Sequence, residues 1–272
     1  MLIHNGHLVA ETDVHLHISN RSFRYGDGCF ESIRLINGEA PFLRLHYERL
    51  VETTQFLKIN LPESLSYEGF KSQINLLAKT NNVNEGGYAR LTIFRNDGGF
   101  YQPGNNDSQF IIEAVSIADK VYTLNETGLK IGIYSENPKA MVRMSNFKTN
   151  NSLHYVLASI FMKENGLDDC LLVNASGNVV ESSNSNVFVV IDGILLTPPL
   201  TEGCLDGVAR RIILSWIKET GIVFQERPIK VDELDAAYEI IVTNAVRGPR
   251  WIVGIGGGGS SLCEKMVKGM NG

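Results

Sequence analysis

The sequence predicts an α+β fold in two units: a small α+β domain built on an antiparallel sheet with two helices, and a larger, barrel-like α/β domain. Two observations predict it. The chain has 272 residues, 43% of them hydrophobic, so it can bury a sizeable core. Strand-like alternation and helix-like spacing of apolar residues recur along both halves. We place the boundary near residues 116–125 and set the domains at 1–118 and 119–272.

The composition and charge of the chain argue against several kinds of partner. The net charge is −5 and no basic patch carries interleaved aromatic residues, so nucleic acid is not expected as a partner. No apolar run approaches the roughly 20 residues needed to span a bilayer, and residues 1–5 do not read as a signal peptide. The four widely spaced cysteines argue against a metal site and favour a reducing, cytoplasmic location; they are Cys29, Cys170, Cys204 and Cys263.

The first unit begins with a predicted hairpin around Asn5-Gly6. Residues 21–35 read as a glycine-bent loop that feeds a strand. This segment carries two cations, Arg24 and Arg34, either of which could meet a carboxylate.

A helix is predicted from Leu43 to Leu57, with its buried stripe at three- and four-residue steps. His46 and Arg49 lie three residues apart on an adjacent face, so Arg49 projects sideways from a rigid element. Taken alone, this arginine is more simply interpreted as a surface residue.

The rest of the first unit consists of a helix over 64–80 and strands over 87–95 and 110–115. Arg90 and Arg95 are separated by an odd number of residues, so they lie on different faces of their strand, and one of them can face a site.

In the second unit, Lys148 stands just ahead of a helix predicted over 152–165. A strand over 169–173 follows, and then a second apolar strand, 179–191, is interrupted by Glu181 and five small polar residues. Burying such groups without partners costs about 1–3 kcal/mol each, and more for a charge. The segment is therefore either an exposed loop or a place where a polar ligand binds.

One further feature of the second unit could bind an anion. A helix begins at Gly207 and stops at Gly221, and its first turn offers free backbone N–H groups at the positive end of the helix dipole. A strand over 238–244 ends in a polar turn. The glycine run 256–259 reads as a flexible joint before the last helix.

Lys148, Glu181 and the run Glu-Ser-Ser-Asn-Ser-Asn-Val-Phe resemble the class IV aminotransferases, the fold-type IV pyridoxal-phosphate enzymes. The loop over 21–31 and the Leu-x-Gly-Val-x-Arg turn at 205–210 match the same family. The resemblance implies a pyridoxal 5′-phosphate cofactor, with Lys148 forming its Schiff base and Glu181 contacting its pyridine nitrogen. It also implies a cofactor-binding set made up of Arg49, Ser183, Asn184, Leu205, Gly207, Val208, Ala209, Thr243 and Asn244.

That family includes branched-chain aminotransferases, D-amino acid aminotransferases and 4-amino-4-deoxychorismate lyases, and the sequence departs from each pattern. The loop at 96–103 lacks the arginine-histidine pair common in the D-amino acid enzymes, and Leu153 stands where branched-chain enzymes often have tyrosine. Many members also carry threonine where this chain has Ala209. The turn Thr243-Asn244-Ala245 has some likeness to the lyases.

We hypothesise that Arg24 and Arg90 bind the substrate carboxylate, with Phe30, Asn244 and Arg247 also facing the substrate. The expected reaction moves an amino group between an amino acid and a 2-oxo acid such as 2-oxoglutarate, with D-amino acids ahead of branched-chain L-amino acids. A lyase that releases pyruvate and 4-aminobenzoate is the alternative, and a non-catalytic cofactor-binding protein is a third reading. The resemblance also implies a homodimer.

Overall fold

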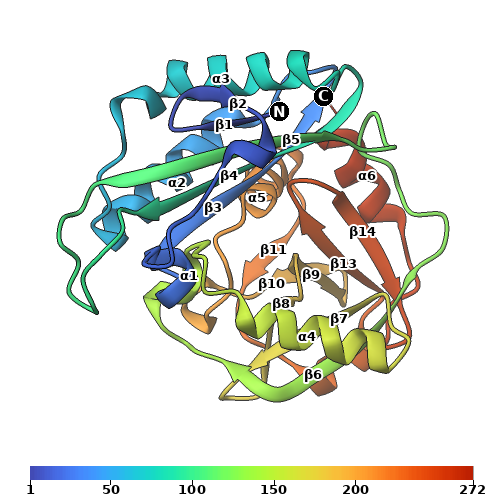
Figure 1. The fold of residues 1–272 in the computed structure, drawn as a ribbon. Helices are drawn as coiled ribbons and strands as arrows, with labels where there is room; N and C mark the ends of the chain where they lie inside the picture. Colours follow the sequence, from blue (N-terminus) through green and yellow to red (C-terminus); the bar gives the residue numbers. More distant parts are fainter. Residues whose placement is uncertain (272) are drawn as a thin grey trace. The chain divides into compact units, whose positions relative to one another are not determined.

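The computed structural model describes residues 1–271, which divide into two compact units. Unit 1 comprises Met1–Val121 together with Lys148–Asn151, and unit 2 comprises Tyr122–Phe147 and the chain from Ser152 onward (Figure 1). The boundary at 118/119 assigned Lys148 to the second domain, whereas its segment packs in unit 1. The reason is local: Phe30 N donates to Lys148 O at 3.0 Å and Asn150 N donates to Gly28 O at 2.9 Å.

Unit 1 contains a five-stranded antiparallel sheet in the order β2-β1-β5-β4-β3. The predicted hairpin at Asn5-Gly6 joins the first two strands, with both turn residues at positive φ. The strands are β1 (Leu2–His4), β2 (His7–Val9), β3 (Gly28–Ile36), β4 (Gly86–Arg95) and β5 (Ser108–Ser116).

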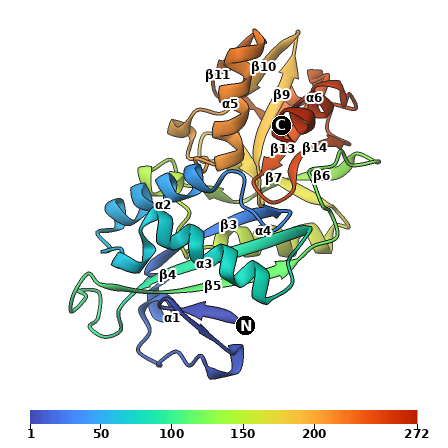
Figure 2. The same cartoon turned by 90° about the horizontal axis from the view of Figure 1, so that it is seen from above.

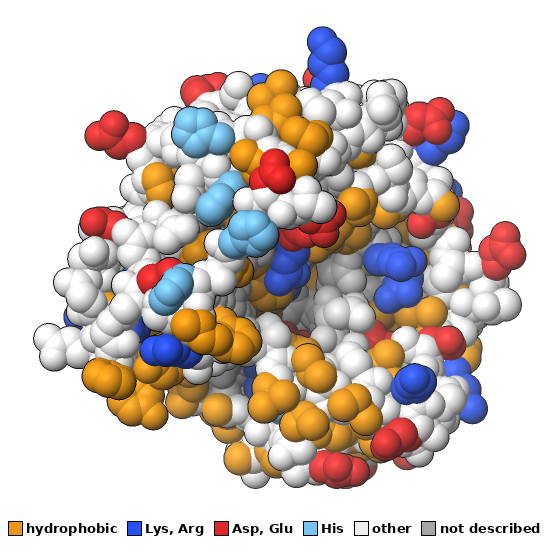
Figure 3. Space-filling model, viewed as in Figure 1, with side chains coloured by type: hydrophobic (Ala, Val, Ile, Leu, Met, Phe, Trp, Pro, Cys, Tyr) orange, Lys and Arg blue, Asp and Glu red, His pale blue; other side chains and the backbone are white. Residues whose placement is uncertain are grey.

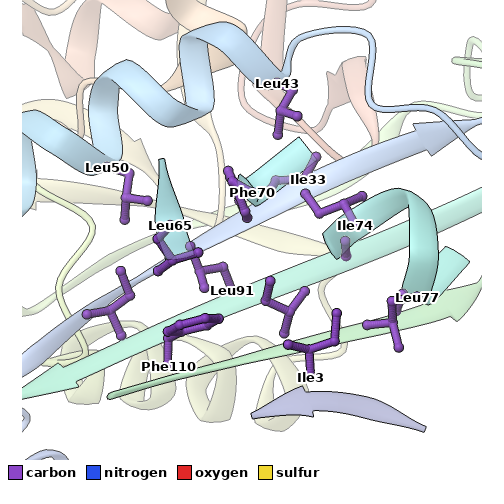
Figure 4. Packing of buried hydrophobic residues seen from close by; sticks show 14 of the residues in the cluster. Ile3, Ile33, Leu43, Leu50, Leu65, Phe70, Ile74, Leu77, Leu91 and Phe110 are labelled. Carbon is purple, nitrogen blue, oxygen red and sulfur yellow. The ribbon is translucent and has the colours of Figure 1, made fainter. Parts of the chain in front are cut away.

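Helices α2 (Leu43–Leu57) and α3 (Tyr67–Thr80) cover one face of this sheet and enclose its apolar core (Figures 2 and 4). The predicted inward residues of the second helix are all buried, namely Phe70, Ile74, Leu77 and Ala78. That helix starts at Tyr67 because the Ser66 side chain accepts Gly69 N, so 63–65 form a separate turn, η2 (Glu63–Leu65).

One loop prediction in unit 1 is wrong. Residues 21–25 form a short helix, α1 (Arg21–Tyr25), because the Asn20 side chain accepts the backbone N–H of Phe23. Gly26 ends it in the left-handed region at φ 65°. A further turn, η1 (Glu11–Asp13), precedes it.

Unit 2 contains a nine-stranded mixed sheet that curls around its own core, in the order β11-β10-β9-β13-β14-β6-β7-β8-β12 (Figure 1). Three strand pairs are parallel: β10 with β11, β14 with β6, and β6 with β7. The strands are β6 (Leu129–Lys139), β7 (Asp169–Asn174), β8 (Asn178–Ser182), β9 (Asn186–Ile191), β10 (Ile194–Thr197), β11 (Phe224–Glu226), β12 (Ile229–Lys230), β13 (Glu239–Asn244) and β14 (Gly248–Val253).

Helices α5 (Val208–Thr220) and α6 (Ser261–Met270) bury an apolar cluster against β9 and β13. Three 3₁₀ turns complete the unit: η3 (Arg143–Asn146), η4 (Leu200–Glu202) and η5 (Val231–Ala236). The glycine run is an anchored turn, because Gly257 N donates to Ala237 O at 2.7 Å and Gly259 N donates to Tyr238 O at 3.1 Å.

Helix α4 (Leu153–Glu164) behaves differently from the other long helices. Ala158 is its one fully buried residue and packs against Tyr134, Cys170 and Leu172 of the neighbouring strands. Its apolar stripe faces outward instead, and Figure 3 shows hydrophobic side chains gathered over this helix. The exposed positions are Leu153, Val156, Leu157 and Ile160. Across residues 1–271, no helix combines the length and the apolar character that a membrane crossing requires.

Candidate active site

Unit 1 brings three of the predicted site residues together around one aromatic ring. Lys148 Nζ lies 4.3 Å from the Phe30 ring centroid, and the Arg90 guanidinium carbon lies 3.9 Å from the same point. The two cationic centres are therefore no more than about 8 Å apart. Both contacts place a cation against an aromatic ring, an interaction worth about 0.5–2 kcal/mol. A lysine amine and an arginine that could bind a carboxylate thus share one apolar platform.

Glu31, the residue after Phe30 on β3, points to the opposite face of the sheet and is the centre of a buried ionic cluster. The Glu31 carboxylate accepts from Arg49 Nε at 2.8 Å and Nη2 at 2.6 Å, and His46 Nδ1 lies 2.7 Å from its Oε2. All three residues are at most 3% exposed, so Arg49 is not a surface residue. Its place in the cofactor-binding set stays a prediction.

Burial and the ionic partners shift the pKa values in this cluster. Burial by itself raises the pKa of Glu31, but the charge of Arg49 and the hydrogen bonds from His46 and Arg49 outweigh it and lower the pKa from 4.5 to about 2. Burial lowers the pKa of His46 despite its contact with Glu31, and the charges of Arg49 and Lys148 act in the same direction. At neutral pH the cluster therefore holds an ionised carboxylate and a neutral imidazole.

The other arginines of unit 1 have structural contacts. Arg24 is exposed on α1, and its Nε donates to Ile18 O at 3.0 Å. Arg34 is buried, and its Nη2 donates to the carbonyls of Asp119 and Val121. Arg95 donates to Asp27 on the face of β4 opposite Arg90. Arg90 alone among these contacts the Phe30 platform.

In unit 2, Glu181 is the centre of a second buried cluster. Its Oε1 accepts from Tyr155 OH at 2.7 Å and from Lys139 Nζ, and its Oε2 accepts from Leu205 N at 2.8 Å. Lys139 Nζ also lies 2.8 Å from Tyr155 OH. Burial and then the charge of Glu181 raise the pKa of Tyr155 well above 10, so its hydroxyl stays a donor.

Sequence reasoning missed both Lys139 and Tyr155. A lysine at the end of an apolar strand was the available signal for Lys139. Tyr155 stands two residues beyond Leu153, the position where branched-chain enzymes often have tyrosine, and its place on α4 brings the phenol to Glu181.

The polar run after Glu181 is not an exposed loop, because a buried carboxylate meets it. Asp169 is fully buried, and its Oδ1 accepts from Ser183 Oγ at 2.7 Å and Ser183 N at 3.2 Å, while its Oδ2 accepts from Ser182 Oγ at 2.8 Å. Asn184 is exposed and accepts from Asn244 Nδ2 at 3.1 Å. The turn is held by the protein itself, with Asn184 and Asn244 at its open side.

The start of α5 has the features of an anion site. Gly207 occupies the N-cap and supplies no side-chain acceptor, so the first N–H groups, at Val208 and Ala209, lack intrahelical partners. Asn186 lies against Gly207, donates to Leu205 O at 2.7 Å, and leaves no room for a Cβ at 207. Thr243 pairs with Asn186 across β13 and β9, and its fully buried hydroxyl has no partner within the described structure.

The groups of unit 2 fit a cofactor with a basic ring nitrogen and a phosphate. Glu181 presents a carboxylate oxygen that receives a single donor, and the α5 N-terminus with the Thr243 hydroxyl supplies unpaired donors for an oxyanion. Asn244 Oδ1 accepts from the N–H groups of Val246 and Arg247, which fixes the turn after β13, while the Arg247 side chain is exposed.

Comparison with known proteins gives a consistent family. The family described as amino-transferase class IV matches residues 28–255. A putative branched-chain-amino-acid aminotransferase of Methanocaldococcus jannaschii is 30% identical over 240 residues, covering 88% of this chain and 82% of the relative. A D-alanine aminotransferase of Listeria monocytogenes is 28% identical (88% and 82% covered), and an aminodeoxychorismate lyase of Vibrio harveyi is 25% identical (89% and 88% covered).

Among solved structures, the fold is similar to a branched-chain aminotransferase from Thermoproteus uzoniensis crystallised with norvaline. The TM-score is 0.89 at 26% identity, with 98% of this chain and 92% of that chain covered. The α+β fold class predicted from the sequence is therefore confirmed.

Proposed function

Because the chain belongs to the class IV aminotransferase family of pyridoxal-phosphate-dependent transaminases, we propose that it transfers an amino group between an amino acid and a 2-oxo acid such as 2-oxoglutarate, with Lys148 bonding the cofactor. The observation that carries the proposal is the placement of Lys148 Nζ and the Arg90 guanidinium against the Phe30 ring. This arrangement offers a nucleophilic amine and a carboxylate anchor at a fixed separation.

Each side chain has a proposed task. Lys148 Nζ would bond the cofactor aldehyde with loss of water, and as a free amine it would move the substrate Cα proton. Bound pyridoxal phosphate supplies an electron-accepting ring. Glu181 would accept a hydrogen bond from the protonated ring nitrogen. The phosphate would be bound at the Gly207 N-cap by the backbone N–H groups of Val208 and Ala209 with the Thr243 hydroxyl, since the Gly207 N–H already donates to Leu205 O. Arg49 is the side-chain cation proposed for the same phosphate.

The remaining residues of the predicted cofactor set have positioning roles in this proposal. Ser183 fixes the turn after Glu181 through Asp169, and Asn184 and Asn244 are hydrogen-bonded to each other. Leu205 donates its backbone N–H to Glu181.

For the substrate, we propose that Arg90 binds the carboxylate, with D-amino acids as the first class to test. Arg24 is less suited to this task, because its contact is to a backbone carbonyl at an exposed position. Branched-chain L-amino acids are the second class, which the apolar Phe30 ring and the Methanocaldococcus jannaschii relative favour. The Vibrio harveyi relative favours the lyase alternative.

The test is a visible absorption spectrum of the purified holoenzyme after separate additions of D-alanine, D-glutamate, L-leucine and aminodeoxychorismate. Loss of the yellow band with one amino acid, and its return with 2-oxoglutarate, is the expected result and identifies the stereochemical class. Pyruvate release from aminodeoxychorismate with an unchanged band would replace transamination with the lyase reaction. The matched variants are Lys148→Ala, which should lack the band, and Lys58→Ala at an exposed position, which should keep it.

We also propose that the enzyme is a homodimer and that the exposed stripe of α4 contributes to the interface. Leu153 is 69% exposed, and Val156 and Ile160 are about half exposed, whereas monomers rarely expose a contiguous apolar patch of this kind. Met141, Val142 and Met144, in the segment before α4, are also exposed. The four unpaired, buried cysteines support a reducing, cytoplasmic location.

A further inference from the structure

Lys139 is a buried cation to which the reaction described above gives no task. It ends strand β6 (Leu129–Lys139), is 7% exposed, and forms an ion pair with Glu181 while its Nζ lies 2.8 Å from Tyr155 OH. We propose that Lys139 is a positioning residue that neutralises Glu181 and directs its second carboxylate oxygen to the cofactor ring nitrogen. The proposal rests on the role proposed above for Glu181.

Counting hydrogen-bond donors indicates which oxygen remains for the cofactor. A carboxylate oxygen accepts about two hydrogen bonds. Oε1 of Glu181 receives two donors, Lys139 Nζ and Tyr155 OH, so it is filled. Oε2 receives the backbone N–H of Leu205 at 2.8 Å and keeps one acceptor position. A ring N–H is therefore directed to Oε2, and Lys139 holds the carboxylate in the rotamer that presents it.

The charge balance around Glu181 depends on Lys139. From α4, His154 and Tyr155 face the carboxylate, and Cys204 faces it from the loop before α5. Burial, and then the charge of Lys139, lower the pKa of His154, and burial with the charge of Glu181 raises the pKa of Cys204 to about 12. Both groups are uncharged at neutral pH, so Lys139 supplies the positive charge in contact with Glu181.

This charge has a consequence for the bound cofactor. A fixed cation disfavours the protonated form of a nearby group. Lys139 therefore lowers the midpoint pH at which the cofactor chromophore titrates, compared with a site that contains Glu181 without Lys139. Lys139 also donates to Tyr155, so one ammonium orders both side chains that meet the carboxylate.

The first experiment titrates the visible band of the holoenzyme with pH in the wild type, Lys139→Gln and Lys139→Arg. Lys139→Gln is expected to raise the midpoint by about half a pH unit or more, and Lys139→Arg, which keeps the charge, to stay within about 0.2 unit of the wild type. An unchanged midpoint in Lys139→Gln would leave Lys139 with a packing role alone and overturn the proposal. A wild type without any visible band would instead count against the role of Lys148.

The second experiment needs no cofactor. In the apoprotein, Lys139→Gln leaves a buried carboxylate without its cation and is expected to lower the melting temperature by about 5–10 °C. Adding Glu181→Gln removes the stranded charge as well, so the double variant should recover at least half of that loss. A double variant no more stable than Lys139→Gln would show that charge compensation is not what Lys139 provides. The comparison stands even if Lys139→Gln binds no cofactor.

Discussion

Replacing Glu31 with glutamine should destabilise unit 1 in a pH-dependent way. The Glu31 carboxylate is buried and shared by Arg49 and His46, and its pKa is lowered from 4.5 to about 2. A shift of this size corresponds to about 3 kcal/mol of folding free energy at neutral pH, since one unit is worth about 1.4 kcal/mol. Glu31→Gln should therefore lower the free energy of unfolding at pH 7 by about 3 kcal/mol, within the range for a broken buried ion pair.

The pH dependence separates this cause from lost packing. A lowered carboxyl pKa stabilises the fold fully above pH 4.5, and the contribution is lost as pH falls toward 2. Protonation of His46 destabilises both proteins below pH 6.5, because burial lowers its pKa on folding, so the smaller difference at low pH is assigned to Glu31. The difference in the free energy of unfolding between the wild type and Glu31→Gln should thus be about 2 kcal/mol smaller at pH 3 than at pH 7.

The assay is urea unfolding of the apoprotein at the two pH values. If two transitions are seen, the one whose midpoint Glu31→Gln changes is compared between the two proteins. Glu113→Gln, an exposed change of the same chemistry on β5, is the control and should stay within about 0.5 kcal/mol of the wild type. A loss below about 1 kcal/mol at pH 7, or an equal loss at both pH values, would refute the ionic account of this cluster.

Three further outcomes are expected. Asp169→Asn removes the charge and one of the two oxygens that together accept three hydrogen bonds from Ser182 and Ser183, and should lower stability by about 2–3 kcal/mol in thermal unfolding; a loss under about 0.5 kcal/mol would contradict the role of Asp169. Gly207→Ala places a Cβ against Asn186 and should weaken cofactor binding about tenfold by fluorescence titration, whereas Gly104→Ala, which points into open space, should not; equal affinities would argue against the α5 N-terminus as the phosphate site. Val156→Asp should shift gel-filtration elution to the monomer, while Ser215→Asp on α5 keeps the dimer; an unchanged dimer in both would remove α4 from the interface.

The sequence predicted the elements of this fold well because their signals are local. Helix α2 begins and ends at the predicted residues, and all four predicted inward residues of α3 are buried. The hairpin at Asn5-Gly6 follows from turn chemistry that two residues carry.

The partners of the polar residues could not be predicted, because they depend on contacts between distant strands. The serines after Glu181 read as either an exposed loop or a ligand site, and the buried carboxylate that meets them, Asp169, lies 13 and 14 residues earlier in the chain. Likewise, the 42-residue separation of Lys139 from Glu181 leaves no local pattern, and only the pairing of β6 and β8 with β7 brings them together.

The stripe of α4 shows a different limit of sequence reasoning. Apolar residues at helical spacing predict a helix correctly, but the same spacing results whether the stripe faces the core of the chain or a second chain. Domain membership has a similar limit, since backbone hydrogen bonds to β3 place Lys148 in unit 1 although the chain before and after it belongs to unit 2.

The central claim is that Lys148 is the lysine that bonds pyridoxal phosphate, and borohydride reduction of the holoenzyme tests it most directly. Reduction makes the lysine–cofactor bond permanent, and peptide mapping by mass spectrometry then locates the labelled residue. The account predicts one phosphopyridoxyl group per chain, on Lys148. A label on Lys139, the lysine that contacts Glu181, would contradict both the proposed function and the positioning role assigned to Lys139.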